Sequence, residues 1–88
     1  MKFKLCQPKL EFPKFTGDGD DIFYWVFRTR QYFEVIGIEE ALKVKVASVH
    51  MTGSAIKWHQ NYMLEKQGLL FVPWEDYVVD TSNKFRFS

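Results

Sequence analysis

The side chains best suited to metal or acid–base chemistry are two histidines and one cluster of aspartates. His50 and His59 lie nine positions apart, without the H-E-x-x-H spacing that places two imidazoles on one helix face for zinc. The cluster T-G-D-G-D-D at residues 16–21 does not fit a calcium loop, because that template needs a further ligand, a glycine and a distal glutamate at fixed offsets. We expect no bound metal and no cofactor.

Catalytic motifs are also missing from the sequence. It contains no phosphate-binding loop, no dinucleotide glycine fingerprint and no nucleophile elbow. The acidic pairs Glu39–Glu40 and Glu75–Asp76 lie where helices are expected to begin, and the helix dipole explains acids there without catalysis. We therefore expect that the protein is not an enzyme.

The composition predicts one small folded domain. A chain of 88 residues that is 47% hydrophobic and 18% aromatic has enough apolar surface for a core. The net charge of +1 gives no field that attracts nucleic acid or a membrane, and no apolar run approaches the ~20 residues of a membrane span. The single cysteine, Cys6, excludes an internal disulfide and fits an intracellular, cytoplasmic location.

The residues between 39 and 66 predict a central pair of helices, 39–51 and 53–66, around which the chain is organised. The first helix is apolar on two sides, which is typical of a helix buried between two partners. One side carries Leu42, Val46 and Val49, and the opposite side carries Val44, Ala47 and Met51.

The junction of these helices has its own signals. Gly53 is suited to a left-handed residue that ends the first helix. Thr52 or Ser54 is expected to cap the second helix by accepting a bond from a free backbone N–H.

A first helix over 20–36 and a last helix over 74–86 complete an all-α bundle of about four helices. We assign residues 1–15 to an extended N-terminal arm, because Pro8 and Pro13 exclude a helix there, and residues 16–88 to the helical domain. The core face of the first helix is expected to carry Ile22, Trp25, Val26, Tyr32, Phe33 and Ile36. The predicted structural core of the domain is Trp25, Phe33, Val46, Trp58, Tyr62, Trp74, Tyr77 and Phe85.

Phe23 and Phe27 do not belong to the core face of the first helix. Helical geometry places them one turn apart on the opposite side, with Arg30 and Glu34. Two interpretations stay open: either the arm covers the two rings with Leu10, Phe12 or Phe15, or another molecule does, since exposed aromatic patches mark interaction sites.

Several fragments together resemble the Gag capsid region of gypsy-class long-terminal-repeat retrotransposons. They are F-P-K-F-T-G-D at 12–18, W-V-F-R-T-R-Q-Y-F at 25–33, K-V-K-V-A-S-V-H-M-T-G-S-A-I-K-W-H-Q at 43–60, G-L-L at 68–70, W-E-D-Y at 74–77 and K-F at 84–85. The resemblance implies an all-helical amino-terminal capsid lobe. It also implies kinship with domesticated Gag proteins such as neuronal Arc, whose corresponding lobe binds short peptides.

The sequence departs from the family in two respects. Gag proteins often carry a C-x2-C-x4-H-x4-C zinc knuckle, whereas the 88 residues contain only Cys6. D-T-S-N at 80–83 is poorer helix material than the family's equivalent.

The resemblance favours a self-assembly module that makes Gag–Gag contacts within a cytoplasmic, virus-like particle. By that resemblance the first helix lines the ring of a capsomere, through Phe23, Phe27, Arg30, Gln31 and Glu34. The alternative is a lobe that binds short linear peptides in a groove formed by Leu10, Phe12, Phe15, Phe23 and Phe27. A third hypothesis, RNA binding through Lys2, Lys4, Lys9 and Lys14, is weaker, because four lysines give only weak, salt-sensitive binding.

Overall fold

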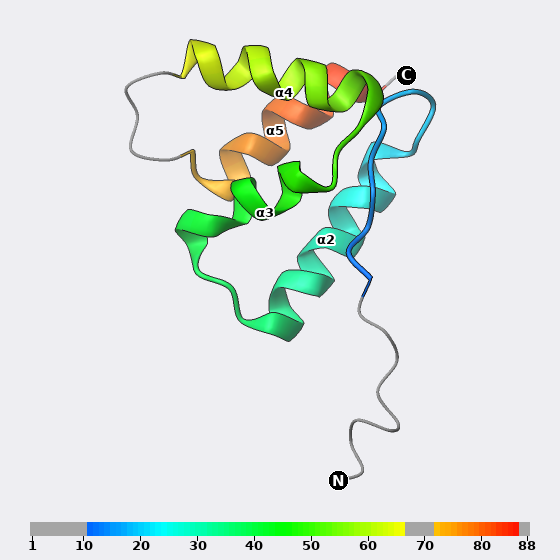
Figure 1. Ribbon diagram of the computed structural model, residues 1–88. Coiled ribbons are helices and arrows are strands. Elements are labelled where there is room, and N and C mark those ends of the chain that lie inside the picture. The colour runs from blue at the N-terminus through cyan, green and yellow to red at the C-terminus, as the bar shows by residue number, and fades with distance from the viewer. Residues whose placement is uncertain (1–10, 67–71, 87–88) are drawn as a thin grey trace, which may run out of the picture.

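A computed structural model describes residues 11–66 and 72–86, which form an all-α domain without strands (Figure 1). This confirms the predicted fold class and the four predicted helices. The helices are α2 (Ile22–Ile36), a 3-10 turn η1 (Glu40–Leu42), α3 (Lys43–Val49), α4 (Gly53–Glu65) and α5 (Trp74–Phe85). Leu10 and the rest of the arm before it, together with the segment 67–71, lie outside the described residues.

Both ends of α2 are set by local sequence. The Asp21 carboxylate accepts hydrogen bonds from the backbone N–H groups of Phe23 and Tyr24, at 3.0 and 3.2 Å, so the helix begins at Ile22. It ends at Gly37, whose φ of 66° is left-handed and whose N–H donates to the Phe33 carbonyl at 2.9 Å.

The described part of the arm is a component of the core. Phe15 forms an isolated parallel bridge with Met51, and its ring lies between Trp25 and Phe85, with centroids 5.1 and 5.2 Å away. Phe12 is also buried, and its ring stacks on His50 at 4.3 Å. Residues 11–15 thus join α2 to the turn before α4, and they run beside α2 in Figure 1.

The loop after the arm holds the start of α4. Thr16 accepts a hydrogen bond from the Ala55 N–H at 2.8 Å, and Asp18 accepts bonds from the N–H and the hydroxyl of Ser54. Gly53 is left-handed, with a φ of 58°, but it begins α4 and does not end α3. The expected caps were wrong. Thr52 makes no side-chain cap bond, and Ser54 donates to the Asp18 carboxylate instead of accepting a bond from the helix.

The prediction that the helix over 39–51 is buried on both sides was also wrong. Val44, Ala47 and Met51 are buried, because α3 packs against α5 on that side. Within the described residues the opposite side is largely open: Leu42 and Val49 are 43% and 76% exposed, and Val46 is half-buried.

Ile36 does not belong to the core either, since it is 42% exposed. It is the last residue of α2, and the chain turns away at Gly37 immediately after it.

The core is a set of aromatic rings shared by α2, α4 and α5. Trp74 lies against Phe33 with centroids 5.0 Å apart, and Tyr77 lies against Tyr62 at 5.4 Å. Of the predicted core, Val46 and Trp58 are only half-buried at its edge. The buried members are Trp25, Phe33, Tyr62, Trp74, Tyr77 and Phe85.

Candidate functional site

Two exposed phenylalanines of the first helix lie on the face of α2 that points away from the core. Phe23 is 59% exposed and Phe27 is 57% exposed. Because Ile22, Trp25 and Val26 turn inward to the core, helical geometry directs the two phenyl rings outward and one turn apart. We name Phe23, Phe27, Arg30, Gln31 and Glu34 the aromatic face.

The polar residues of the aromatic face differ in their partners. The Arg30 guanidinium is paired with the carboxylate of Glu75 on α5. Both groups are substantially exposed, so the pair contributes only about 0–1 kcal/mol to stability. The Gln31 side chain accepts a hydrogen bond from Arg28 at 3.2 Å. In the part of the chain that the structure describes, the Glu34 carboxylate has no ion-pair partner.

The arm does not cover the aromatic face within the described residues. Phe12 and Phe15 point into the core, where they are 6% and 0% exposed. They are therefore unable to form an open groove together with Phe23 and Phe27, and that predicted arrangement was wrong. The arm alternates between apolar and polar residues and so has two sides. The sequence did not show that the side chains of Phe12 and Phe15 face the core.

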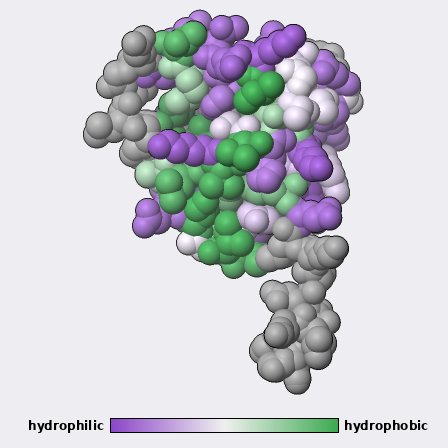
Figure 2. All heavy atoms as spheres, in the orientation of Figure 1, coloured by the Kyte–Doolittle hydropathy of each residue, from purple (hydrophilic) through white to green (hydrophobic). Residues whose placement is uncertain are grey.

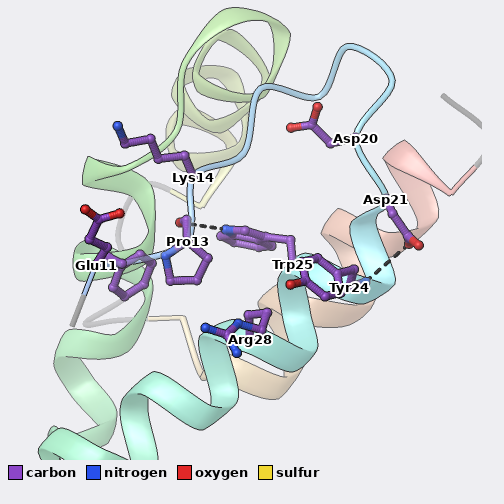
Figure 3. Close-up of a pocket in the computed structure, with 9 residues that line it drawn as sticks. Glu11, Pro13, Lys14, Asp20, Asp21, Tyr24, Trp25 and Arg28 are labelled. Carbon is purple, nitrogen blue, oxygen red and sulfur yellow. Dashed lines mark hydrogen bonds between the residues drawn. The ribbon is translucent and has the colours of Figure 1, made fainter. Parts of the chain in front are cut away.

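A different groove does lie beside the arm (Figure 3). It has a volume of about 450 Å³ and runs between residues 11–14 and the N-terminal half of α2. Trp25 forms its base, with the indole N–H donating to the Pro13 carbonyl at 3.1 Å. Its lining residues are Glu11, Phe12, Pro13, Lys14, Asp20, Asp21, Tyr24, Trp25 and Arg28.

Sequence reasoning missed Tyr24 and Arg28, which form the α2 side of this groove. Their i, i+4 spacing was visible, but their relevance depends on which flank of α2 the arm follows. Both lie on the side of the helix next to Phe23 and Phe27. The groove and the aromatic face therefore adjoin on α2, where Arg28 donates to Gln31 at 3.2 Å.

The titratable groups of the interior make hydrogen bonds between neighbouring helices. His59 Nδ1 lies 2.7 Å from the Tyr77 hydroxyl, and the Tyr62 hydroxyl donates to Asp80 at 2.6 Å. Burial lowers the pKa of His59 and raises the pKa of Tyr77, which keeps both rings neutral. These bonds join α4 to α5.

Among residues 11–66 and 72–86, no group of three or more potential ligands could hold a metal ion. None of the helices described is long and apolar enough to cross a membrane. Of the arm lysines, only Lys14 lies within the described residues, and it is exposed.

The described residues form an all-α domain with part of the N-terminal arm folded into its core and an exposed aromatic helix face. Residues 9–86 match the family described as "Retrotransposon-derived protein PEG10, N-terminal capsid-like domain", and the chain belongs to this family. The predicted kinship with retrotransposon Gag capsid lobes is thereby confirmed. Searches of curated proteins and of solved structures found no match.

Proposed function

We propose that the domain associates with copies of itself through the aromatic face of α2, as a structural, non-catalytic lobe of a Gag-derived protein. The observation that carries this proposal is the exposure of Phe23 and Phe27 on a surface that nothing in the described chain covers. Burying such a ring against a partner contributes roughly 1.5–3 kcal/mol. Contacts of this size are individually weak, which suits shells built from many repeated interfaces.

Sedimentation velocity over a concentration series tests the proposal with Phe27→Ser. The variant should remain monomeric at concentrations where the wild type associates, and it should melt at the wild-type temperature or slightly above it. Tyr24→Ser is the matched control, because Tyr24 is an equally exposed aromatic residue, 62% accessible, on another side of the same helix. If Phe27→Ser associates as the wild type does, the proposal is wrong.

The groove of Figure 3 supports a second candidate function, the binding of short linear peptides. It combines an aromatic base with charges of both signs, Lys14 and Arg28 on one hand and Glu11 on the other, which suits an extended segment that carries backbone dipoles and a few polar side chains. This groove differs from the predicted peptide groove, because its lining includes Tyr24 and Arg28 but not Phe15, Phe23 or Phe27.

Titration of a labelled peptide library against the domain would test this second function. Tyr24→Ser should weaken any peptide that binds there, while Phe27→Ser should leave its affinity unchanged. The opposite pattern would remove the groove from consideration.

The proposed site of action is the cytoplasm, within a virus-like particle. We infer no strong binding of RNA by these residues, because the net charge is only +1 and few phosphates can be contacted. Sub-micromolar RNA binding at physiological salt would contradict this inference.

A further inference from the structure

A second apolar surface lies on η1 and α3, on the side opposite the buried side of α3. Leu42, Val46 and Val49 follow the i, i+4, i+7 spacing, and we name them the aliphatic face. Leu42 is 43% exposed and Val49 is 76% exposed. Figure 2 shows hydrophobic side chains gathered over α3 and the C-terminal end of α2, where Val35 is 66% exposed. Val46 is half-buried and packs against the edge of the core, so Leu42 and Val49 form the open part of this surface.

The aliphatic face carries a positive charge that is free to pair. Lys45 is exposed and borders Val46 and Val49 on the helix, and within the described residues it has no ion-pair partner. Lys43, two positions earlier, is already paired with Glu40 at 3.2 Å. The aliphatic face thus has one unpaired ammonium group at its edge.

The aromatic face has the complementary character. It presents two phenyl rings and the unpaired carboxylate of Glu34, while the charge of Arg30 is occupied by Glu75. If two aromatic faces met around a two-fold axis, two Glu34 carboxylates would enter one interface, and two aliphatic faces would likewise bring two Lys45 groups together. Like charges brought together in this way oppose association.

We propose that the aromatic face of one copy docks on the aliphatic face of the next copy, with Glu34 pairing with Lys45. This inference rests on the proposed self-association and specifies its partner surface. Because the two surfaces are different, the contact is heterologous, and repetition of it generates a ring or an open chain in place of a closed dimer. The occupant of the aliphatic face is therefore a second copy of this chain.

Charge reversal tests the pairing directly. Glu34→Lys and Lys45→Glu should each reduce the association constant by about tenfold or more, because each places like charges in the contact. The double variant should recover most of the wild-type association constant. An equimolar mixture of the two single variants should do the same, because every contact between unlike variants pairs opposite charges. Both residues are exposed, so all of these proteins should melt at the wild-type temperature.

Mixing two blocked variants tests the heterologous geometry. Phe27→Ser removes the aromatic face and Val49→Ser removes the aliphatic face, so each protein alone should be monomeric. Their equimolar mixture should form a one-to-one dimer and nothing larger, because each copy retains one usable surface.

The outcomes distinguish this inference from the proposed self-association through the aromatic face, on which it rests. If Val49→Ser and Lys45→Glu associate as the wild type does while Phe27→Ser does not, the aliphatic face is not the partner surface, and self-association through the aromatic face stands. If Phe27→Ser itself associates normally, self-association through the aromatic face and its contact with the aliphatic face are both wrong. A mixture of Phe27→Ser and Val49→Ser that stays monomeric also overturns the heterologous contact.

Discussion

Gly17 shows how one residue fixes the position of the loop that holds α4. Its φ is +79°, a region that disfavours side chains. A Cβ atom there would lie 2.7 Å from Cε1 of Phe85 and 3.0 Å from the Ala55 nitrogen. Any side chain at this position would push the loop away from both helices.

We expect Gly17→Ala to destabilise the domain by roughly 1–3 kcal/mol through backbone strain, with a further loss of similar size from crowding. Gly19→Ala is the control, because Gly19 also has a positive φ, but nothing lies within 4 Å of its added Cβ. Thermal unfolding should therefore rank Gly17→Ala well below Gly19→Ala. Equal melting temperatures would mean that the close contact at Gly17 does not affect the stability of the domain.

The tryptophans provide a second prediction at this scale. Trp74 is 2% exposed, whereas Trp58 is only half-buried, so truncation of each removes different amounts of packing. Trp74→Ala should cost about 3–5 kcal/mol, enough to abolish cooperative unfolding in so small a domain. Trp58→Ala should cost clearly less and leave a measurable transition in chemical denaturation. A larger loss at Trp58 would contradict the observed packing.

At the scale of the residue, helical spacing predicted inward and outward side chains best where the helix was long. Trp25 and Phe33 are buried and Phe27 is exposed, as their positions on α2 require. Burial of Trp58 was overestimated, because periodicity identifies a stripe but not how far the neighbouring helix extends over it.

At the scale of the element, the helices were predictable from apolar periodicity and turn residues, and their partners were not. α3 has two apolar sides in the sequence, but in the described structure only the side of Val44 and Ala47 is fully buried. The capping of α4 was missed because Asp18 is 36 residues away from Ser54, and a cap from so distant a residue leaves no local signal. The route of the arm beside α2, which creates the groove, depends equally on tertiary contacts.

The contact between α4 and α5 should make the stability of the domain depend on pH. The folded-state pKa of His59 is lowered below its usual 6.5 by burial, so the unfolded chain binds more protons as the pH falls. The contribution of neutral His59 to stability is fully present above about pH 6.5 and is lost as the pH falls below that value. Asp18 and Glu40 also have lowered pKa values, but as carboxylates they act at more acidic pH.

We expect the wild-type melting temperature to fall between pH 7.5 and pH 5.5. His59→Asn should show a flatter profile over this interval, because the side-chain amide can still form a hydrogen bond with the Tyr77 hydroxyl but does not titrate. A wild-type profile as flat as that of the variant would show that His59 does not couple folding to protonation.

At the scale of the whole molecule, the domain presents two different apolar surfaces and a separate groove. Membership of the capsid-like family was predictable, because its fragments are spread in order along the chain. Helical spacing placed Phe23 and Phe27 off the core face, but the aliphatic face and the groove could only be recognised from the structure, since a sequence does not show which apolar residues find an internal partner. Self-association is therefore the property on which the account depends.

A dilution series followed by NMR of the ¹⁵N-labelled domain tests self-association most directly, because it reports which amides change environment as copies meet. The account predicts concentration-dependent shifts centred on Phe23, Phe27 and Glu34, and on Lys45 and Val49, with Glu11 and Lys14 on the arm side of the groove unaffected. Shifts confined to the groove, or a spectrum that does not change up to millimolar concentration, would contradict it.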